Sequence, residues 1–217
     1  MASGPACPLG GMRMQTTRRK LLALLLLAPA AAAAADGAPP RAPVEALNQG
    51  ILAIMHAGRG TGFAQRAQMF APVVLDAFDL PRILRNSVGP RFEGFPPPVQ
   101  AELLDVFTQF TVASYVANFD DYDGERFDIL PATRSAGGDE VVQTRLLVSG
   151  GDPVKLDYVV HRENGGWKII DVLFNGTISR VAVQRSDFRA LLVGGEAEPL
   201  IASLRSKVAR LAAGQKD

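Results

Sequence analysis

The first half of the chain carries apolar residues at three- and four-residue steps, which places them along one face of an α-helix. Val44, Leu47 and Ile51 begin the series, and glycine or proline interrupts it where a helix is expected to end. The pattern predicts four helices, which run from Val44 to Met55, Phe63 to Val74, Pro81 to Val88, and Val99 to Asn118.

After Gly124 the apolar residues alternate with polar ones, as in a strand with one buried face. Two of these strands flank Asn164-Gly165, the dipeptide most typical of a tight β-hairpin. The loops are too short for parallel crossovers, so we expect an antiparallel meander of about four strands. Its strands are centred on residues 127–129, 142–148, 154–160 and 167–174.

Two further helices are expected after the turn Asn175-Gly176-Thr177. The first spans about Ile178 to Leu192, and the second follows Gly195 with an apolar row at helical spacing. Helices, then a meander, then helices are typical of the α+β class. We therefore predict an α+β fold with N-terminal helices, an antiparallel sheet and C-terminal helices.

The last long strand, residues 167–174, is apolar on both of its faces. Strict alternation gives one face Ile170, Val172 and Phe174, and the other Trp167, Ile169 and Leu173. A sheet that covers a core on one side only would leave one of these sets in water. Either helices cover both faces, which the pattern alone favours, or one face lines an apolar cavity.

The first 35 residues have the three parts of a bacterial export signal. A basic start at Arg18-Arg19-Lys20 precedes an apolar run of 15 residues, Leu21 to Ala35, too short for the ~20 residues that span a bilayer. We expect a signal peptide over residues 1–35, by the general secretory or the twin-arginine route, and a mature protein in the periplasm. An uncleaved membrane anchor is the alternative.

The mature chain begins with a Pro/Gly/Ala linker, residues 36–43, and a single domain is expected over residues 44–213. It has 19 basic and 22 acidic residues, a net charge of −3, which does not favour a nucleic-acid partner. The only cysteine, Cys7, lies in the signal segment, so disulfides and thiol chemistry are not expected in the mature protein.

Few residues offer catalytic or metal-binding chemistry. The two histidines, His56 and His161, lack the spacing of a metal site, so no metal and no cofactor are expected. Asp171 is the notable carboxylate, because Ile169 and Leu173 flank it in the last long strand. It is either a structural carboxylate that binds backbone amides or an arginine, or a general base in an apolar pocket. The structural role is favoured, because no second catalytic group is identified.

Several short motifs, taken in order, resemble the MlaC type of the toluene-tolerance family, over nearly all of residues 44–212. They are Phe78-Asp79, Val88-Gly89, Tyr115, Tyr122-x-Gly124, Val154-Lys155-Leu156-Asp157-Tyr158, Trp167-Lys168-Ile169-Ile170-Asp171-Val172 and Asn175-Gly176-Thr177-Ile178-Ser179. Residues 183–188, 194–195 and 200–201 are similar to the hopanoid-associated HpnM branch. The chain departs from many members at Asn175, where they have Glu, and at Ile170, where they have an aromatic residue.

The resemblance implies a non-enzymatic periplasmic carrier that encloses the acyl chains of a phospholipid or hopanoid between a curved sheet and helices. The expected partners are an inner-membrane ABC transporter complex and an outer-membrane lipoprotein complex, with transient contact at membrane surfaces. The candidate lipid-binding residues are Phe107, Phe110, Tyr115, Leu146, Val148, Leu156, Tyr158, Val160, Ile170, Val172 and Phe174. For each of them an ordinary place in a packed core is the alternative.

Two other classes of protein stay open. One is an isomerase- or hydrolase-like enzyme that uses Asp171 in an apolar pocket. The other is an envelope interaction protein whose last helix docks a partner through the surface that bears Arg205, Lys207 and Arg210. Basic residues near a helix end also suit the helix dipole, which favours a last helix that simply packs on the domain.

Overall fold

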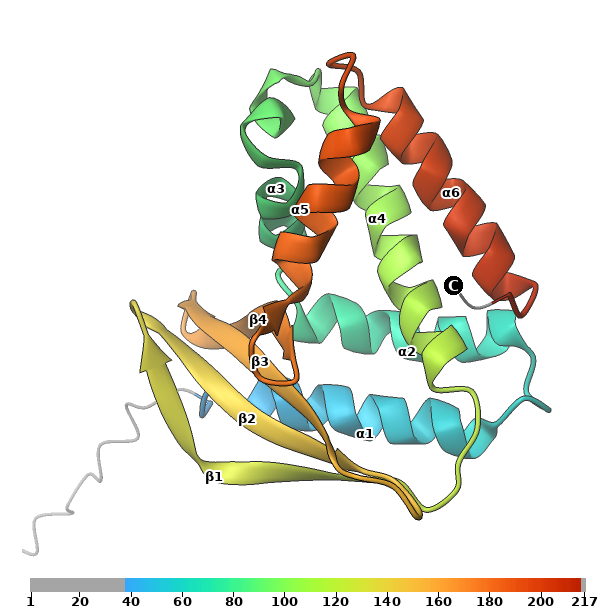
Figure 1. Cartoon of the computed structure of the whole chain (residues 1–217), viewed down its shortest axis with the longest axis vertical. Coiled ribbons are helices and arrows are strands. Elements are labelled where there is room, and N and C mark those ends of the chain that lie inside the picture. Colours follow the sequence, from blue (N-terminus) through green and yellow to red (C-terminus); the bar gives the residue numbers. More distant parts are fainter. Residues whose placement is uncertain (1–37, 216–217) are drawn as a thin grey trace, which may run out of the picture. The chain divides into compact units, whose positions relative to one another are not determined.

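The helical first half is confirmed in the computed structural model, which describes residues 38–215 (Figure 1). The predicted export signal, residues 1–35, lies outside the described residues. Four α-helices and one 3₁₀ helix precede the sheet: α1 (Ala42–Ala57), α2 (Phe63–Ala77), α3 (Leu80–Val88), η1 (Gly89–Gly94) and α4 (Pro97–Asn118). The boundaries of α1 to α4 lie close to those that the apolar spacing predicts.

Proline and aspartate explain where these helices begin. Asp79 caps α3, because its carboxylate accepts a hydrogen bond of 3.0 Å from the amide of Arg82. Helix α4 begins at Pro97 rather than at Val99, since proline has no amide hydrogen to satisfy in a first turn and its fixed φ suits one. The sequence did not predict η1, because Gly89-Pro90 indicated only the end of α3.

The sheet is an antiparallel meander in the order β1-β2-β3-β4-β5. Its strands are β1 (Arg126–Ala136), β2 (Asp139–Leu147), β3 (Val154–Glu163), β4 (Gly166–Phe174) and β5 (Ile178–Ser179). The predicted hairpin turn between β3 and β4 is present, with φ of 47° at Asn164 and 82° at Gly165, the left-handed conformation that such a turn requires. Residues Gly137 and Gly138, with φ of 61° and 96°, join β1 to β2 in the same way.

The fifth strand corrects the sequence prediction of a helix from Ile178. Ile178 and Ser179 instead pair with Phe174 and Leu173 across a tight turn, and helix α5 (Arg180–Leu191) begins only afterwards. Ser179 caps that helix, since its hydroxyl accepts a hydrogen bond of 2.9 Å from the amide of Ala182. The chain therefore passes from β5 into α5 without a loop, which brings the start of α5 to the edge of the sheet.

A β-bulge at Ile170 corrects the predicted faces of β4. Val159 pairs with Asp171, but the next residue of β3, Val160, pairs with Ile169, so β4 carries one extra residue between them. Because partners in an antiparallel pair lie on the same face, Ile169 shares the face of Val160 and Tyr158, and so does Val172. Ile169 and Val172, which strict alternation placed on opposite faces of β4, therefore lie on the same face.

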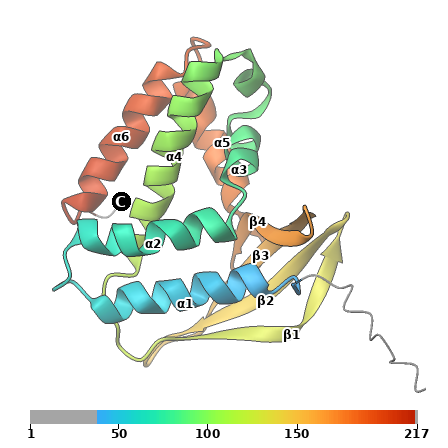
Figure 2. The same cartoon turned by 180° about the vertical axis from the view of Figure 1, so that it is seen from behind.

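The described helices lie on one side of the sheet, as the two opposite views show (Figures 1 and 2). Helix α1 packs against α2, β1 and β4, and α2 packs in turn against α4. Val142, Tyr158, Val160 and Ile169 supply the sheet's buried contribution to the main hydrophobic core. The first of the two possibilities for β4, in which helices cover both faces of the sheet, is therefore wrong for the described residues.

The last helix, α6 (Glu198–Ala212), packs along α4, and its apolar row is used in that contact. Leu200 and Leu204 are fully buried in the core. Of the basic residues beside this row, Arg205 forms an ion pair of 2.6 Å with Glu102 of α4, and the Lys207 ammonium lies 5.7 Å from the centre of the Phe110 ring. The apolar row of α6 is therefore not free to dock a partner.

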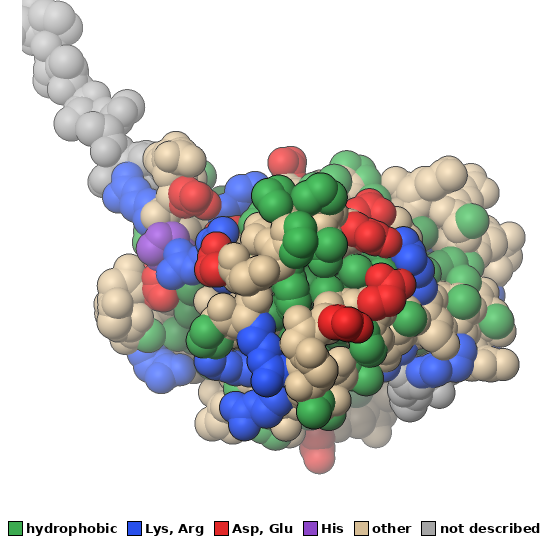
Figure 3. Space-filling view, turned by 90° about the horizontal axis from the view of Figure 1, so that it is seen from above, with side chains coloured by type: hydrophobic (Ala, Val, Ile, Leu, Met, Phe, Trp, Pro, Cys, Tyr) green, Lys and Arg blue, Asp and Glu red, His purple; other side chains and the backbone are tan. Residues whose placement is uncertain are grey.

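Charge is mixed on one face of the described residues. The face seen from above in Figure 3 shows basic and acidic side chains interspersed around a group of exposed hydrophobic ones. Within residues 38–215, no helix is both long enough and apolar enough to cross a membrane.

Candidate functional site

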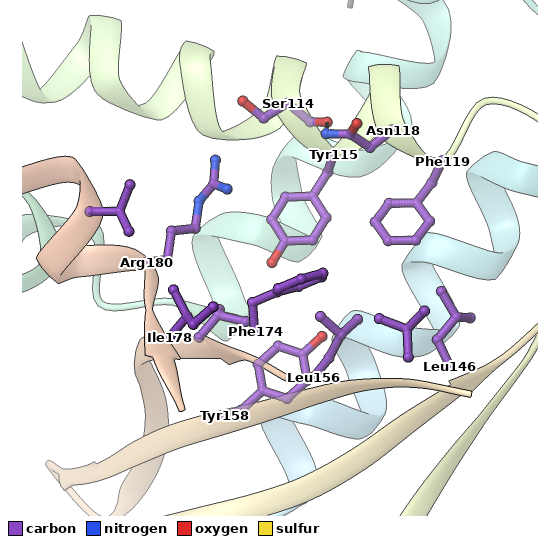
Figure 4. A pocket seen from close by; sticks show the side chains of 13 residues that line it. Ser114, Tyr115, Asn118, Phe119, Leu146, Leu156, Tyr158, Phe174, Ile178 and Arg180 are labelled. Carbon is purple, nitrogen blue, oxygen red and sulfur yellow. Dashed lines mark hydrogen bonds between the residues drawn. The ribbon is translucent and has the colours of Figure 1, made fainter. Parts of the chain in front are cut away.

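An apolar cavity of about 450 Å³ lies between helix α4, the helix-facing side of β2 to β4, and the segment from β5 into α5 (Figure 4). Helix α4 contributes one wall and the strands contribute the opposite wall. Most of the side chains that line it are hydrophobic. The lining residues are Ser114, Tyr115, Asn118, Phe119, Leu146, Val154, Leu156, Tyr158, Val172, Phe174, Ile178, Arg180 and Val183.

Six of the eleven predicted lipid-contact residues line this cavity: Tyr115, Leu146, Leu156, Tyr158, Val172 and Phe174. Leu156 and Tyr158 lie on β3 opposite Phe174 and Val172 of β4, so pairing across the sheet brings these four together. Tyr115 faces them from α4 (Figure 4). The fold thus brings Tyr115 of α4 close to residues of β3 and β4 that are far from it in the sequence.

The structure places the other five predicted residues elsewhere. Phe107 lines an adjoining small pocket of about 30 Å³, roughly the space of one water molecule, which shares Tyr115 and Arg180 with the large cavity. Phe110 and Val160 are buried in the main hydrophobic core. Val148 follows the end of β2, and Ile170 is the extra residue of the β4 bulge; neither lines the cavity.

Seven of the lining residues were not predicted from the sequence. Four of them had a detectable signal in the sequence, and three did not. Ser114, Asn118 and Phe119 share a helical stripe with Tyr115, and Val154 continues the alternation of Leu156, so spacing alone pointed to these four. Ile178, Arg180 and Val183 gave no such signal, because their place depends on the short strand β5 and on the start of α5.

Aromatic contacts and a buried arginine fix the end of α4 that carries the cavity wall. The Tyr115 ring packs against Phe70, at 5.4 Å between ring centres, and stacks on Phe119 at 6.0 Å. The Arg66 guanidinium donates hydrogen bonds to the carbonyl oxygens of Val116 at 2.9 Å and Phe119 at 3.4 Å. A cation that binds the free carbonyls at a helix end stabilises that end, so Tyr115 and Phe119 are held in place.

Of the polar side chains that face the cavity, three have no hydrogen-bond or ion-pair partner among the described residues. The side chains of Ser114 and Asn118 donate hydrogen bonds to carbonyls of their own helix, at 2.8 Å each. Within residues 38–215, in contrast, no hydrogen bond joins the hydroxyl of Tyr115 or Tyr158 to another group, and no ion pair joins Arg180 to a carboxylate. The cavity therefore combines apolar walls with two phenol groups and one cation.

Burial shifts both tyrosines in the same direction. Although one side of Tyr115 faces the cavity, withdrawal from bulk water raises its pKa to about 12, against the weaker opposing effect of the nearby Arg180 charge. Burial also raises the pKa of Tyr158 well above its ordinary value, and the neighbouring Tyr115 adds to that increase. Both hydroxyls are therefore protonated, and are hydrogen-bond donors, across the physiological pH range.

The cavity opens to solvent at a rim that is itself hydrophobic. Phe174, Ile178 and Val183 line the cavity, yet they remain 49%, 50% and 48% exposed. Large apolar side chains that gather in this way at an opening are typical of a site that an apolar ligand or a membrane covers. The rim lies where β4, β5 and α5 meet.

Asp171 lies outside the large cavity and lines only the small pocket. Its carboxylate accepts hydrogen bonds from the amide of Val172 at 2.8 Å, the amide of Val181 at 3.1 Å and the hydroxyl of Ser179 at 2.5 Å. It thus ties the end of β4 to the first turn of α5. Both of its oxygens accept hydrogen bonds from these donors.

Among the described residues, the histidine on the sheet lies away from the cavity. His161 lies 2.6 Å from Asp139 through its Nδ1 atom, on the strand pair β2 and β3, away from the lining residues. Within the described part of the chain, no group of three or more His, Cys, Asp or Glu side chains is placed to hold a metal ion.

The fold and the site define a class of α+β proteins in which helices and one face of an antiparallel meander enclose an apolar cavity. The family model described as "MlaC protein" matches residues 45–206. The chain belongs to the MlaC family, and the resemblance seen in the sequence is thereby confirmed at the level of the family. The match does not distinguish the HpnM branch, which stays a prediction.

A solved structure of a phospholipid-binding protein from Ralstonia solanacearum, determined in complex with a phospholipid, has a similar fold. It is 23% identical in sequence and superposes with a TM-score of 0.70, over 81% of this chain and 99% of that chain. At this level of identity the likeness supports the α+β fold. A comparison with curated protein sequences finds no match.

Proposed function

We propose that this protein is a periplasmic lipid carrier that encloses the acyl chains of a phospholipid or a hopanoid in the cavity. The apolar cavity itself carries the proposal, because its volume of about 450 Å³ falls within the ~300–1,000 Å³ of typical ligand sites. Its mouth is apolar and open, so a lipid can enter chains first and leave its headgroup in water. Family membership and the phospholipid bound to the similar fold both support this function.

The energetics explain why a carrier needs such a cavity. Withdrawing a two-chain lipid from a bilayer exposes roughly 30 methylene groups at ~0.8 kcal/mol each, a gross cost on the order of 20 kcal/mol. A water-filled polar groove would recover little of that cost. A cavity walled by Leu146, Leu156, Val172 and Phe174 offers apolar contact instead. We propose the six predicted residues that line it as the lipid-contact residues.

The proposed carrier is not an enzyme, and it works between two membranes. Asp171 acts in it as a structural carboxylate, since its oxygens are occupied by β4 and α5. The export signal over residues 1–35, the linker 36–43 and the domain 44–213 remain part of the proposal. The carrier would exchange lipid with an inner-membrane ABC transporter complex and an outer-membrane lipoprotein complex, in transient contact with each membrane surface.

A vesicle-to-vesicle transfer assay tests the proposal. Purified protein is mixed with donor vesicles that contain a fluorescent phospholipid and a quencher, and with plain acceptor vesicles. The protein should raise the rate of fluorescence recovery in proportion to its concentration. A rate equal to that of vesicles alone, with protein that is folded by circular dichroism, contradicts the carrier function.

A further inference from the structure

The charge at the cavity mouth is carried by one residue. Arg180 is the only charged side chain among the thirteen that line the large cavity, and it is exposed at the first position of α5. The same side chain also lines the small pocket beside Asp171, yet within residues 38–215 it forms no ion pair. An arginine with five donors and no anionic partner has full capacity to bind an anion.

The backbone at the start of α5 cannot replace that arginine as an anion site. The amide of Val181 donates to Asp171, and the amide of Ala182 donates to the Ser179 hydroxyl. These are the groups that a helix N-terminus would otherwise offer to a phosphate. Anion binding at this mouth therefore depends on the Arg180 guanidinium.

Two hydroxyls lie deeper in the cavity, on opposite walls. Tyr158, from β3, is only 1% exposed, and Tyr115 extends from α4 towards it, so that both hydroxyls point into the space between helix and sheet (Figure 4). Neither hydroxyl is bonded to another group within residues 38–215, so both remain available to donate to a ligand in the cavity. A ligand that brings acceptor oxygens to this depth would pair with both donors.

We propose that these three side chains recognise the ester-linked glycerophosphate part of a diacyl phospholipid. Arg180 binds the phosphate at the mouth, and the hydroxyls of Tyr115 and Tyr158 donate hydrogen bonds to the ester carbonyl oxygens below it. This inference rests on the proposed carrier function and adds a chemical specificity to it.

The chemistry of each group fits its assigned partner. A guanidinium matches phosphate with two parallel hydrogen bonds, and such charge-assisted bonds are stronger than neutral ones. A phenol is protonated at physiological pH and donates a hydrogen bond, which suits carbonyl oxygens, because these only accept hydrogen bonds. A neutral lipid without ester groups would leave the cation and both hydroxyls unpaired.

The first test separates the phosphate from the acyl chains. Binding is measured by fluorescence for a phospholipid and for a diacylglycerol with the same labelled chains, with wild type, Arg180→Gln, Arg180→Lys and the control Arg189→Gln. Arg189 is exposed on the same helix and does not line the cavity. We expect Arg180→Gln to weaken phospholipid binding by roughly ten- to a hundredfold and to leave diacylglycerol binding unchanged. Arg180→Lys should recover part of the loss, and Arg189→Gln should match wild type.

The second test compares ester-linked with ether-linked phospholipid, which lacks the carbonyl oxygens. Wild type should bind the ester lipid roughly two- to tenfold more tightly. Tyr158→Phe or Tyr115→Phe should reduce that ratio towards one, with thermal unfolding used to show that each variant is folded.

The outcomes show whether only this inference fails or whether the proposed carrier function fails with it. Wild type that binds phospholipid, diacylglycerol and ether lipid equally well overturns the recognition of the glycerophosphate part, while the carrier function stands. An equal loss of phospholipid and diacylglycerol binding in Arg180→Gln also overturns it. Wild type that binds none of the three lipids overturns both.

Discussion

Asp171 fixes one strand end to one helix start, because its carboxylate bonds to Val172, Ser179 and Val181. Replacing it with Asn keeps the size but exchanges charge-assisted hydrogen bonds of ~1.5–3 kcal/mol for neutral ones of ~0.5–1.5 kcal/mol. We expect Asp171→Asn to lower the free energy of unfolding by about 1–2 kcal/mol, measured by thermal melting, and to retain bound lipid.

The control for this substitution is Asp187→Asn, an exposed aspartate on α5, which should melt like wild type. The opposite result would favour the enzyme hypothesis: unchanged or higher stability in Asp171→Asn, together with lipid that wild type alters chemically on long incubation and the variant does not.

The buried tyrosines predict a loss of stability in alkaline solution. The pKa of Tyr115 is about 12 in the folded protein against 10 for an ordinary tyrosine, and that of Tyr158 is raised as well. The unfolded chain therefore releases these protons at lower pH than the folded protein. The contribution of Tyr115 to stability is complete below pH 10 and is lost as the pH rises from 10 towards 12, and that of Tyr158 is likewise lost only above pH 10.

Denaturant unfolding at a series of pH values measures this effect. The free energy of unfolding of wild type should fall more steeply above pH 10 than that of Tyr158→Phe. Identical slopes for the two proteins would show that Tyr158 has the same pKa in the folded and unfolded states.

At single residues, the sequence could not separate a cavity wall from a packed core. Val160 and Val172 follow the same alternation, yet Val160 is 0% exposed in the core and Val172 lines the cavity. Both environments favour apolar side chains at the same period, so pattern alone does not distinguish them. Arg180 was missed for a different reason, since one arginine among many indicates a site only when its neighbours in space are known.

At the scale of the elements, the Ile170 bulge sets which β4 residues face the helices. The predicted faces assumed strict alternation, and the extra residue moved Ile169 to the side of Val160. No glycine or proline marks this bulge in the sequence. The Asn164-Gly165 hairpin, in contrast, was predictable, because its positive φ angles require residues of this kind.

Two tryptophan substitutions on neighbouring strands test whether one site is a cavity and the other a packed core. Val172→Trp adds bulk to a cavity, so lipid occupancy should fall sharply while stability changes by less than about 1 kcal/mol. Val160→Trp adds the same bulk to a packed core and should cost ~1–3 kcal/mol or more. Thermal unfolding and lipid content are measured on both variants.

Two results would contradict this account of the sheet. One is a large loss of stability in Val172→Trp with unchanged lipid content, which would place the lipid elsewhere. The other is a loss of lipid in a Val160→Trp protein that is as stable as wild type, which would place the cavity deeper than the structure does.

For the whole molecule, the order of helices, meander and helices was predictable, because each element has its own apolar period and its own turn residues. From the sequence, the cavity was one of two possibilities, the other being a core packed on both faces of the sheet. The choice between them depends on how far α4 lies from the sheet, which local patterns do not show. The contribution of β5 and α5 to its mouth arises from a two-residue strand and its tight turn, which local sequence signals did not reveal.

The central claim is that this cavity holds lipid in the cell. The most direct measurement is gentle purification of the native protein from cells, extraction with organic solvent, and mass spectrometry of the extract against a known amount of protein. The account predicts about one molecule of phospholipid or hopanoid per protein. Protein that is lipid-free when isolated, and that takes up no lipid from vesicles, would contradict it.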